Sequence, residues 1–144
     1  MAELNDILLK YRDTPFDYPD YSCVGTTIDL CKLLGSPEPD YGEYAKMDDA
    51  RATIKAIKEG GIYQVHERVL RAVGWLFAGN LYEPGCIRIL SGTVEIDGDT
   101  LDASGGNDYW TMIGSDGHLY GWTQIGLRPI TGGHDEGKTL KCRS

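Results

Sequence analysis

The stretch Thr14–Gly35, TPFDYPDYSCVGTTIDLCKLLG, constrains the fold most, because it places a turn-rich approach directly before a helical pattern. Pro15 and Pro19 fix φ and favour extended backbone in the residue before each. Ser22 is a good N-cap residue, and the apolar side chains after it recur at helical spacing as far as the closing glycine. The pattern therefore predicts a helix that begins at Cys23.

The first turn of this helix is where a cysteine nucleophile would be placed. Unpaired backbone N–H groups and the positive end of the helix dipole stabilise a thiolate there. The alternative interpretation is a small buried residue that closes the start of the helix, and this is the commoner role of a lone cysteine. The stretch alone leaves both interpretations of Cys23 open.

The remaining chain changes from helical to strand periodicity near Cys86. Apolar spacing before that point predicts three further helices, over residues 3–12, 48–60 and 62–77. Alternation after that point predicts short strands over residues 86–90, 93–96, 109–113, 118–123 and 127–130. The order predicts an α+β fold in which N-terminal helices pack on a small antiparallel sheet.

Two finer expectations follow from the same patterns. In the helix that Asp48 caps, Ala50, Ile54 and Ile57 form the expected buried face. We expect one domain over residues 1–131, and a flexible tail over residues 132–144 because that segment is polar and rich in glycine.

The charge of the chain argues against several classes of partner. Its net charge is −8, from 22 acidic and 14 basic residues, and no cluster of Lys and Arg stands out. Nucleic acids and anionic membranes both require a cationic surface, so we expect neither as a partner. No apolar run is long enough to span a membrane, and the N-terminus lacks the pattern of a signal peptide. We therefore expect the protein in the cytoplasm of the cell that makes it.

The four cysteines show no C-x-x-C spacing; they are Cys23, Cys31, Cys86 and Cys142. In a reducing compartment such residues are free thiols rather than disulfides or zinc ligands. We expect no metal and no cofactor.

The stretch Thr14–Gly35 resembles the NlpC-type cell-wall endopeptidases, small papain-like cysteine peptidases that are common in bacteria and in phage tails. Their pattern runs roughly T-P-Y, a W-G-G turn, D-C-S-G, an apolar helix and L-G. The positions that match are Thr14, Pro15, Cys23, Gly25, Leu34 and Gly35, whereas Ser22 and Val24 replace the usual Asp and Ser. The segment YGEYAKMDDARATIKAIKEGG and Gly85 extend the likeness to a phage-encoded subgroup, over most of residues 8–130.

The resemblance implies a papain-like fold with Cys23 as the candidate nucleophile. Aligning the family's H-V-G-I-Y-L-G strand with residues 108–114 puts Asp108 at the histidine position. The next strand supplies the orienting group, for which Thr123 offers a hydroxyl. A carboxylate beside a thiol raises the pKa of the thiol and suppresses the thiolate. The resemblance thus implies a peptidase-like chain that has lost its catalytic pair.

No other histidine fits the missing role. A two-residue turn at residues 115–116 would pair Asp108 with Thr123, and His118 would lie at the far end of the hairpin on the opposite face. His66 falls on an apolar helix face, where we expect a packed histidine with satisfied hydrogen bonds. His134 falls in the expected tail.

Aromatic residues are dense around the expected cleft; those assigned to it are Tyr18, Tyr21, Trp110 and Trp122. Clefts of this kind bind peptides, sugars or protein partners. For Trp110 and Trp122, a place in the core is an equally good interpretation.

Three hypotheses for function remain. The first is a phage virion or tail-associated protein that uses a degenerate peptidase-like domain as a structural or docking module, with other virion proteins or further copies of itself as partners. The second is an active cysteine endopeptidase or amidase that cleaves cell-wall peptides with an unrecognised base. The third is a host-directed binding or inhibitor protein. Loss of the histidine favours the first and the third, and analogy with phage tails favours the first.

Overall fold

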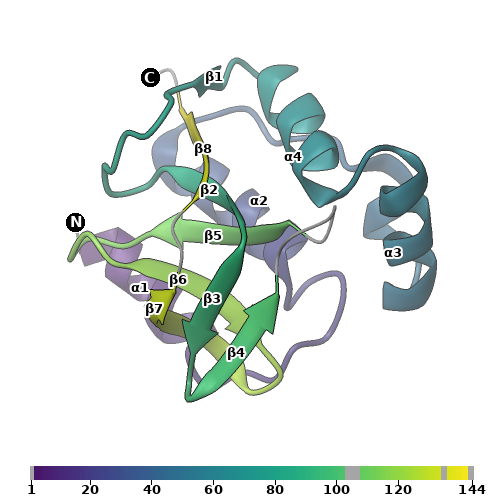
Figure 1. The fold of residues 1–144 in the computed structure, drawn as a ribbon. Coiled ribbons are helices and arrows are strands. Elements are labelled where there is room, and N and C mark those ends of the chain that lie inside the picture. The colour runs from purple at the N-terminus through teal and green to yellow at the C-terminus, as the bar shows by residue number, and fades with distance from the viewer. Residues whose placement is uncertain (1, 103–107, 134–135, 143–144) are drawn as a thin grey trace.

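The computed structural model describes residues 2–102, 108–133 and 136–142. Within these ranges the chain is an α+β protein with four α-helices and an eight-stranded antiparallel sheet (Figure 1). The expected fold class is therefore confirmed, although the sheet is larger than expected. No described helix has the length and apolar character needed to cross a membrane.

The helices come first in the chain; they are α1 (Ala2–Tyr11), α2 (Cys23–Leu34), the short 3₁₀ helix η1 (Gly42–Ala45), α3 (Asp49–Lys58) and α4 (Ile62–Arg71). The strands follow; they are β1 (Leu76–Phe77), β2 (Ile87–Ser91), β3 (Thr93–Ile96), β4 (Asp99–Asp102), β5 (Tyr109–Ile113), β6 (Leu119–Thr123), β7 (Gly126–Gly133) and β8 (Glu136–Lys141). Their order across the sheet is β1-β8-β2-β5-β6-β7-β3-β4.

Helix α2 has the boundaries that its sequence predicts. The Ser22 side chain accepts a hydrogen bond from the Val24 N–H at 3.2 Å and so caps the first turn. Gly35 closes the helix with φ +72°, the left-handed conformation that glycine adopts without strain. Local capping thus fixes Cys23 at the first position of the helix.

Two contacts hold α2 in place. The Trp122 indole N–H donates to the Thr26 hydroxyl at 2.9 Å, which ties the helix to β6. The loop before the helix presses against it at Gly25, where a Cβ atom would lie 1.9 Å from the Asp20 carbonyl oxygen. Helix α2 therefore packs on the sheet, as expected, with its N-terminus held close to β6.

The expected helix over residues 62–77 ends earlier, at Arg71. Gly74 adopts φ +98°, which turns the chain out of the helix and into β1. Leu76, which falls within the expected helix, lies instead in β1 and is 49% exposed.

The hairpin between β5 and β6 differs by one residue from the expected register. Ile113 pairs with Leu119, because the turn is a three-residue loop in which Gly117 takes a left-handed conformation at φ +82°. In this register Tyr109 rather than Asp108 would stand opposite Thr123. The expected pairing of Asp108 with Thr123 is wrong.

The expectation of a flexible segment from residue 132 onward is wrong for residues 136–141. These residues form β8, which lies between β1 and β2. Leu140 is fully buried, and the hydroxyl of buried Thr139 accepts a hydrogen bond from Arg88 at 3.0 Å. Strand β7 also continues past residue 131, and His134 lies outside the described residues.

Candidate functional site

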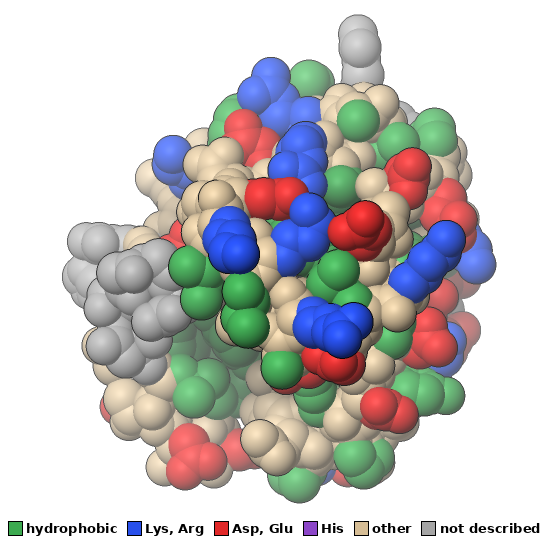
Figure 2. Space-filling model, turned by 90° about the vertical axis from the view of Figure 1, so that its right-hand side faces the viewer, with side chains coloured by type: hydrophobic (Ala, Val, Ile, Leu, Met, Phe, Trp, Pro, Cys, Tyr) green, Lys and Arg blue, Asp and Glu red, His purple; other side chains and the backbone are tan. Residues whose placement is uncertain are grey.

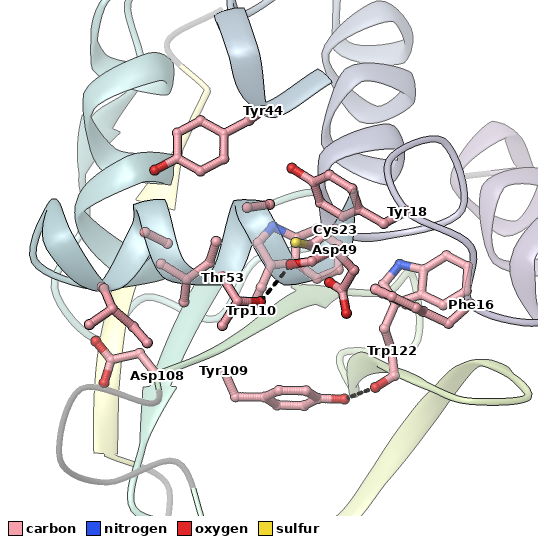
Figure 3. Close-up of a pocket in the computed structure, with 15 residues that line it drawn as sticks. Phe16, Tyr18, Cys23, Tyr44, Asp49, Thr53, Asp108, Tyr109, Trp110 and Trp122 are labelled. Atoms are coloured by element: carbon pink, nitrogen blue, oxygen red, sulfur yellow. Dashed lines mark hydrogen bonds between the residues drawn. The ribbon is translucent and has the colours of Figure 1, made fainter. Parts of the chain in front are cut away.

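A pocket of about 370 Å³ opens between the N-terminus of α2, one face of α3 and the strands β5 and β6 (Figure 3). Aromatic side chains form much of its wall; they are Phe16, Tyr18, Tyr44, Tyr109, Trp110 and Trp122. Figure 2 shows hydrophobic side chains gathered in a hollow at the edge of the face that carries α3 and α4. On that face basic and acidic side chains interleave, so no field of a single sign covers it.

Cys23 lies in the wall of this pocket, and its side chain is partly buried. Withdrawal from solvent, with a smaller contribution from the Asp49 carboxylate, raises the pKa of the thiol to about 12. The backbone N–H groups of Val24 and Cys23 act in the opposite direction but do not outweigh the loss of solvent. The helix N-terminus therefore does not hold Cys23 as a thiolate near neutral pH.

Two carboxylates line the pocket, Asp49 from the first turn of α3 and Asp108 from the residue before β5. Figure 3 shows them on opposite sides of Thr53. Burial raises the pKa of Asp108, and the positive charge of Lys138 only partly offsets this. Asp49, rather than Asp108, is the carboxylate that acts on the Cys23 thiol.

No histidine of the described chain lines the pocket. His66 is fully buried and shares a 2.7 Å hydrogen bond with the Tyr41 hydroxyl through Nδ1. Its Nε2 has no partner among the described groups, so His66 is packed as expected but only half satisfied. His118 is exposed in the turn between β5 and β6.

Thr123 and Tyr21 do not line the pocket, although the sequence assigned both to the site. The Thr123 hydroxyl donates to the Gly126 carbonyl at 2.8 Å and accepts the N–H of Ile125 and of Gly126. It therefore closes the turn between β6 and β7 and is not directed at an imidazole. Tyr21 is 39% exposed and packs edge-on against Tyr11, outside the pocket.

The two tryptophans belong to the core and also to the pocket wall. Trp110 is 3% exposed and Trp122 is 7% exposed. Within the described part of the protein, the Trp110 indole N–H and the Tyr18 hydroxyl are buried without a hydrogen-bond partner. Such groups cost free energy until an acceptor reaches them.

Helix α3 presents to the pocket a face that sequence reasoning missed. Ala52 and Ala56 are its buried residues, while Ile54 and Ile57 are 56% and 63% exposed. The expected buried face of Ala50, Ile54 and Ile57 is therefore wrong, because the helix packs through its two alanines. The signal that would have found the right face is the i, i+4 spacing of these two small residues.

The same face of α3 contributes polar groups that the sequence analysis did not assign. Asp49, Thr53 and Ile57 follow one another at intervals of four residues and all line the pocket. The Thr53 hydroxyl donates to the Asp49 carbonyl at 2.9 Å, as the dashed line in Figure 3 marks.

The described lining of this pocket differs from that of a cysteine peptidase. A cysteine peptidase needs a thiolate and an imidazole that shares its proton. The described lining offers instead a protonated thiol, two carboxylates and aromatic walls. Among the residues that the structure describes, no group of three or more potential metal ligands comes together.

No protein-family model matches this chain, and no curated protein or solved structure matches it.

Proposed function

We propose that this chain is a docking module built on a degenerate, papain-like NlpC-type domain, and that it works in a phage virion or tail. The observation that carries the proposal is the pocket itself. The pocket is largely apolar, and Cys23, whose pKa is raised, lies in its wall. The described lining residues include no imidazole that could take the proton of the thiol.

The rim of the pocket supports docking of another protein. Ile57 and Phe16 line the pocket and are 63% and 37% exposed. A large apolar side chain left exposed beside a cavity is typical of an interaction site, where an apolar anchor fills a pocket.

The resemblance to phage-encoded NlpC-type proteins supports the location in a virion or tail. The pattern around Cys23 and Gly25 carries that resemblance. The close approach of Asp20 to Gly25 agrees with it, since a side chain at this position would collide with the preceding loop. Partners would be other virion or tail proteins, or further copies of the chain.

Gradient fractionation of particles from the producing culture tests this proposal. We expect the protein to co-sediment with intact particles and to bury an interface of about 1,000 Å² or more there. It should remain bound after a wash at moderate salt, because apolar contacts are not screened. Recovery only as a soluble monomer would contradict the virion assignment and would favour a host-directed binding protein.

A further inference from the structure

We propose that the pocket receives a basic side chain, a lysine or an arginine, from a peptide segment of the docking partner. This inference rests on the proposed docking function and names the chemistry of the group that docks.

The charges of the pocket wall carry the inference. Asp49 and Asp108 line the pocket, and no lysine or arginine is among the described lining residues. Neither carboxylate belongs to any ion pair in the described part of the chain, whereas Lys55 and Arg68 are both paired with Glu59. Lys138 acts on Asp108 only partly and forms no described ion pair with it, so two unpaired carboxylates at a largely apolar pocket favour a cation over a neutral or anionic group.

The shape of the pocket favours a long side chain over a small ion. Asp49 and Asp108 lie on opposite sides of Thr53 (Figure 3), so they flank the pocket rather than chelate one centre. The aromatic rings of the pocket wall suit both the apolar stem of a lysine or arginine and its charged end.

The apolar rim of the pocket points to a peptide rather than a free amine. The exposed Ile57 and Phe16 at the rim would contact the residues on either side of the basic one.

The inference is tested by measuring how strongly the whole 144-residue chain retains the peptides of two pentapeptide libraries whose termini are chemically blocked. One library holds lysine at its centre and random residues around it, and the other holds norleucine, which has a similar apolar chain without the charge. We expect at least about tenfold more retention of the lysine library at low salt, and a smaller preference at 0.5 M salt. A third library with central arginine should behave as the lysine library does.

Paired variants locate the effect. Asp49→Asn with Asp108→Asn should remove the preference for lysine over norleucine. The control, Glu3→Gln with Asp6→Asn, changes the net charge equally at exposed positions of α1 and should keep the preference. Equal retention of the two libraries, or a preference that survives loss of both pocket carboxylates, would overturn the inference. The docking function has its separate test in particle fractionation, so either can fail without the other.

Discussion

Acidification from pH 6.5 to pH 4.5 should remove about 2 kcal/mol of unfolding free energy through His66 alone. His66 is fully buried, and burial lowers its pKa from the ordinary 6.5 to about 3. The folded protein therefore keeps His66 neutral in this window, while the unfolded chain takes up a proton. Because the unfolded state binds more protons, the stability is fully present above about pH 6.5 and is lost as the pH falls towards 3.

Urea unfolding at four pH values between 7.5 and 4.5 measures this effect. The free energy of unfolding of His66→Asn should fall less steeply than that of the wild type, by about 1.4 kcal/mol per pH unit below pH 6. His118→Asn is the matched control, because His118 is exposed, and should keep the wild-type slope. Glu59, whose pKa is lowered from 4.5 to about 2, begins to lose its contribution only at the lower end of this window, and it does so equally in both variants. Equal slopes for the two variants would contradict a neutral, buried His66.

The Cys23 thiol should react with iodoacetamide about 100-fold more slowly at pH 7 than an unhindered cysteine. With its pKa raised to about 12, the thiol is ionised far less than a free thiol of pKa about 8.5. At pH 7 the fraction of Cys23 present as thiolate should be lower by more than ~1,000-fold. Because a more basic thiolate is a stronger nucleophile, each Cys23 thiolate should react about 30-fold faster than an ordinary one, which offsets part of this decrease. Peptide mapping by mass spectrometry resolves the rate at Cys23 from the rates at the other three cysteines.

The same protein unfolded in urea is the control for this rate. There Cys23 should react as an ordinary thiol. In the folded protein the rate should keep rising with pH beyond pH 9, without a plateau. A plateau that begins near pH 5 to 6 would show a persistent thiolate and would support an active cysteine peptidase.

The sequence predicts those parts of the fold that depend on local signals. Ser22 and Gly35 act within one turn of α2, so capping residues alone locate both ends of the helix. The hairpin β3–β4 depends on Asp97-Gly98, a turn pair with positive φ at both residues.

The parts that depend on distant contacts were not predicted. Strand β8 is short and polar, and it is a strand because β2, about 50 residues earlier, pairs with it and Arg88 bonds to Thr139. The face of α3 is likewise set by what it packs against, since two alanines rather than two isoleucines are buried. Propensity carries no information about either partner.

The candidate site divides in the same way. Cys23, Asp108, Tyr18, Trp110 and Trp122, all assigned from the sequence, line one pocket; these residues belong to elements that the resemblance or the local pattern located. Asp49 and Thr53 were missed because they lie on the unpredicted face of α3. Thr123, assigned from the resemblance, does not line the pocket because its hydroxyl closes the turn between β6 and β7.

On this account the pocket binds a partner in the particle, and the Cys23 thiol is not needed for this. The most direct test is the amount of protein retained per particle, the occupancy, for three variants. Thr53→Trp places a large ring in the pocket mouth, whereas Ile54→Trp places the same ring on the neighbouring exposed position of α3, outside the lining. Cys23→Ser removes the thiol and leaves the pocket open. In gradient-purified particles we expect occupancy to fall at least tenfold for Thr53→Trp and to stay at the wild-type level for Ile54→Trp and Cys23→Ser. Wild-type occupancy by Thr53→Trp, or loss of occupancy by Cys23→Ser alone, would contradict this account.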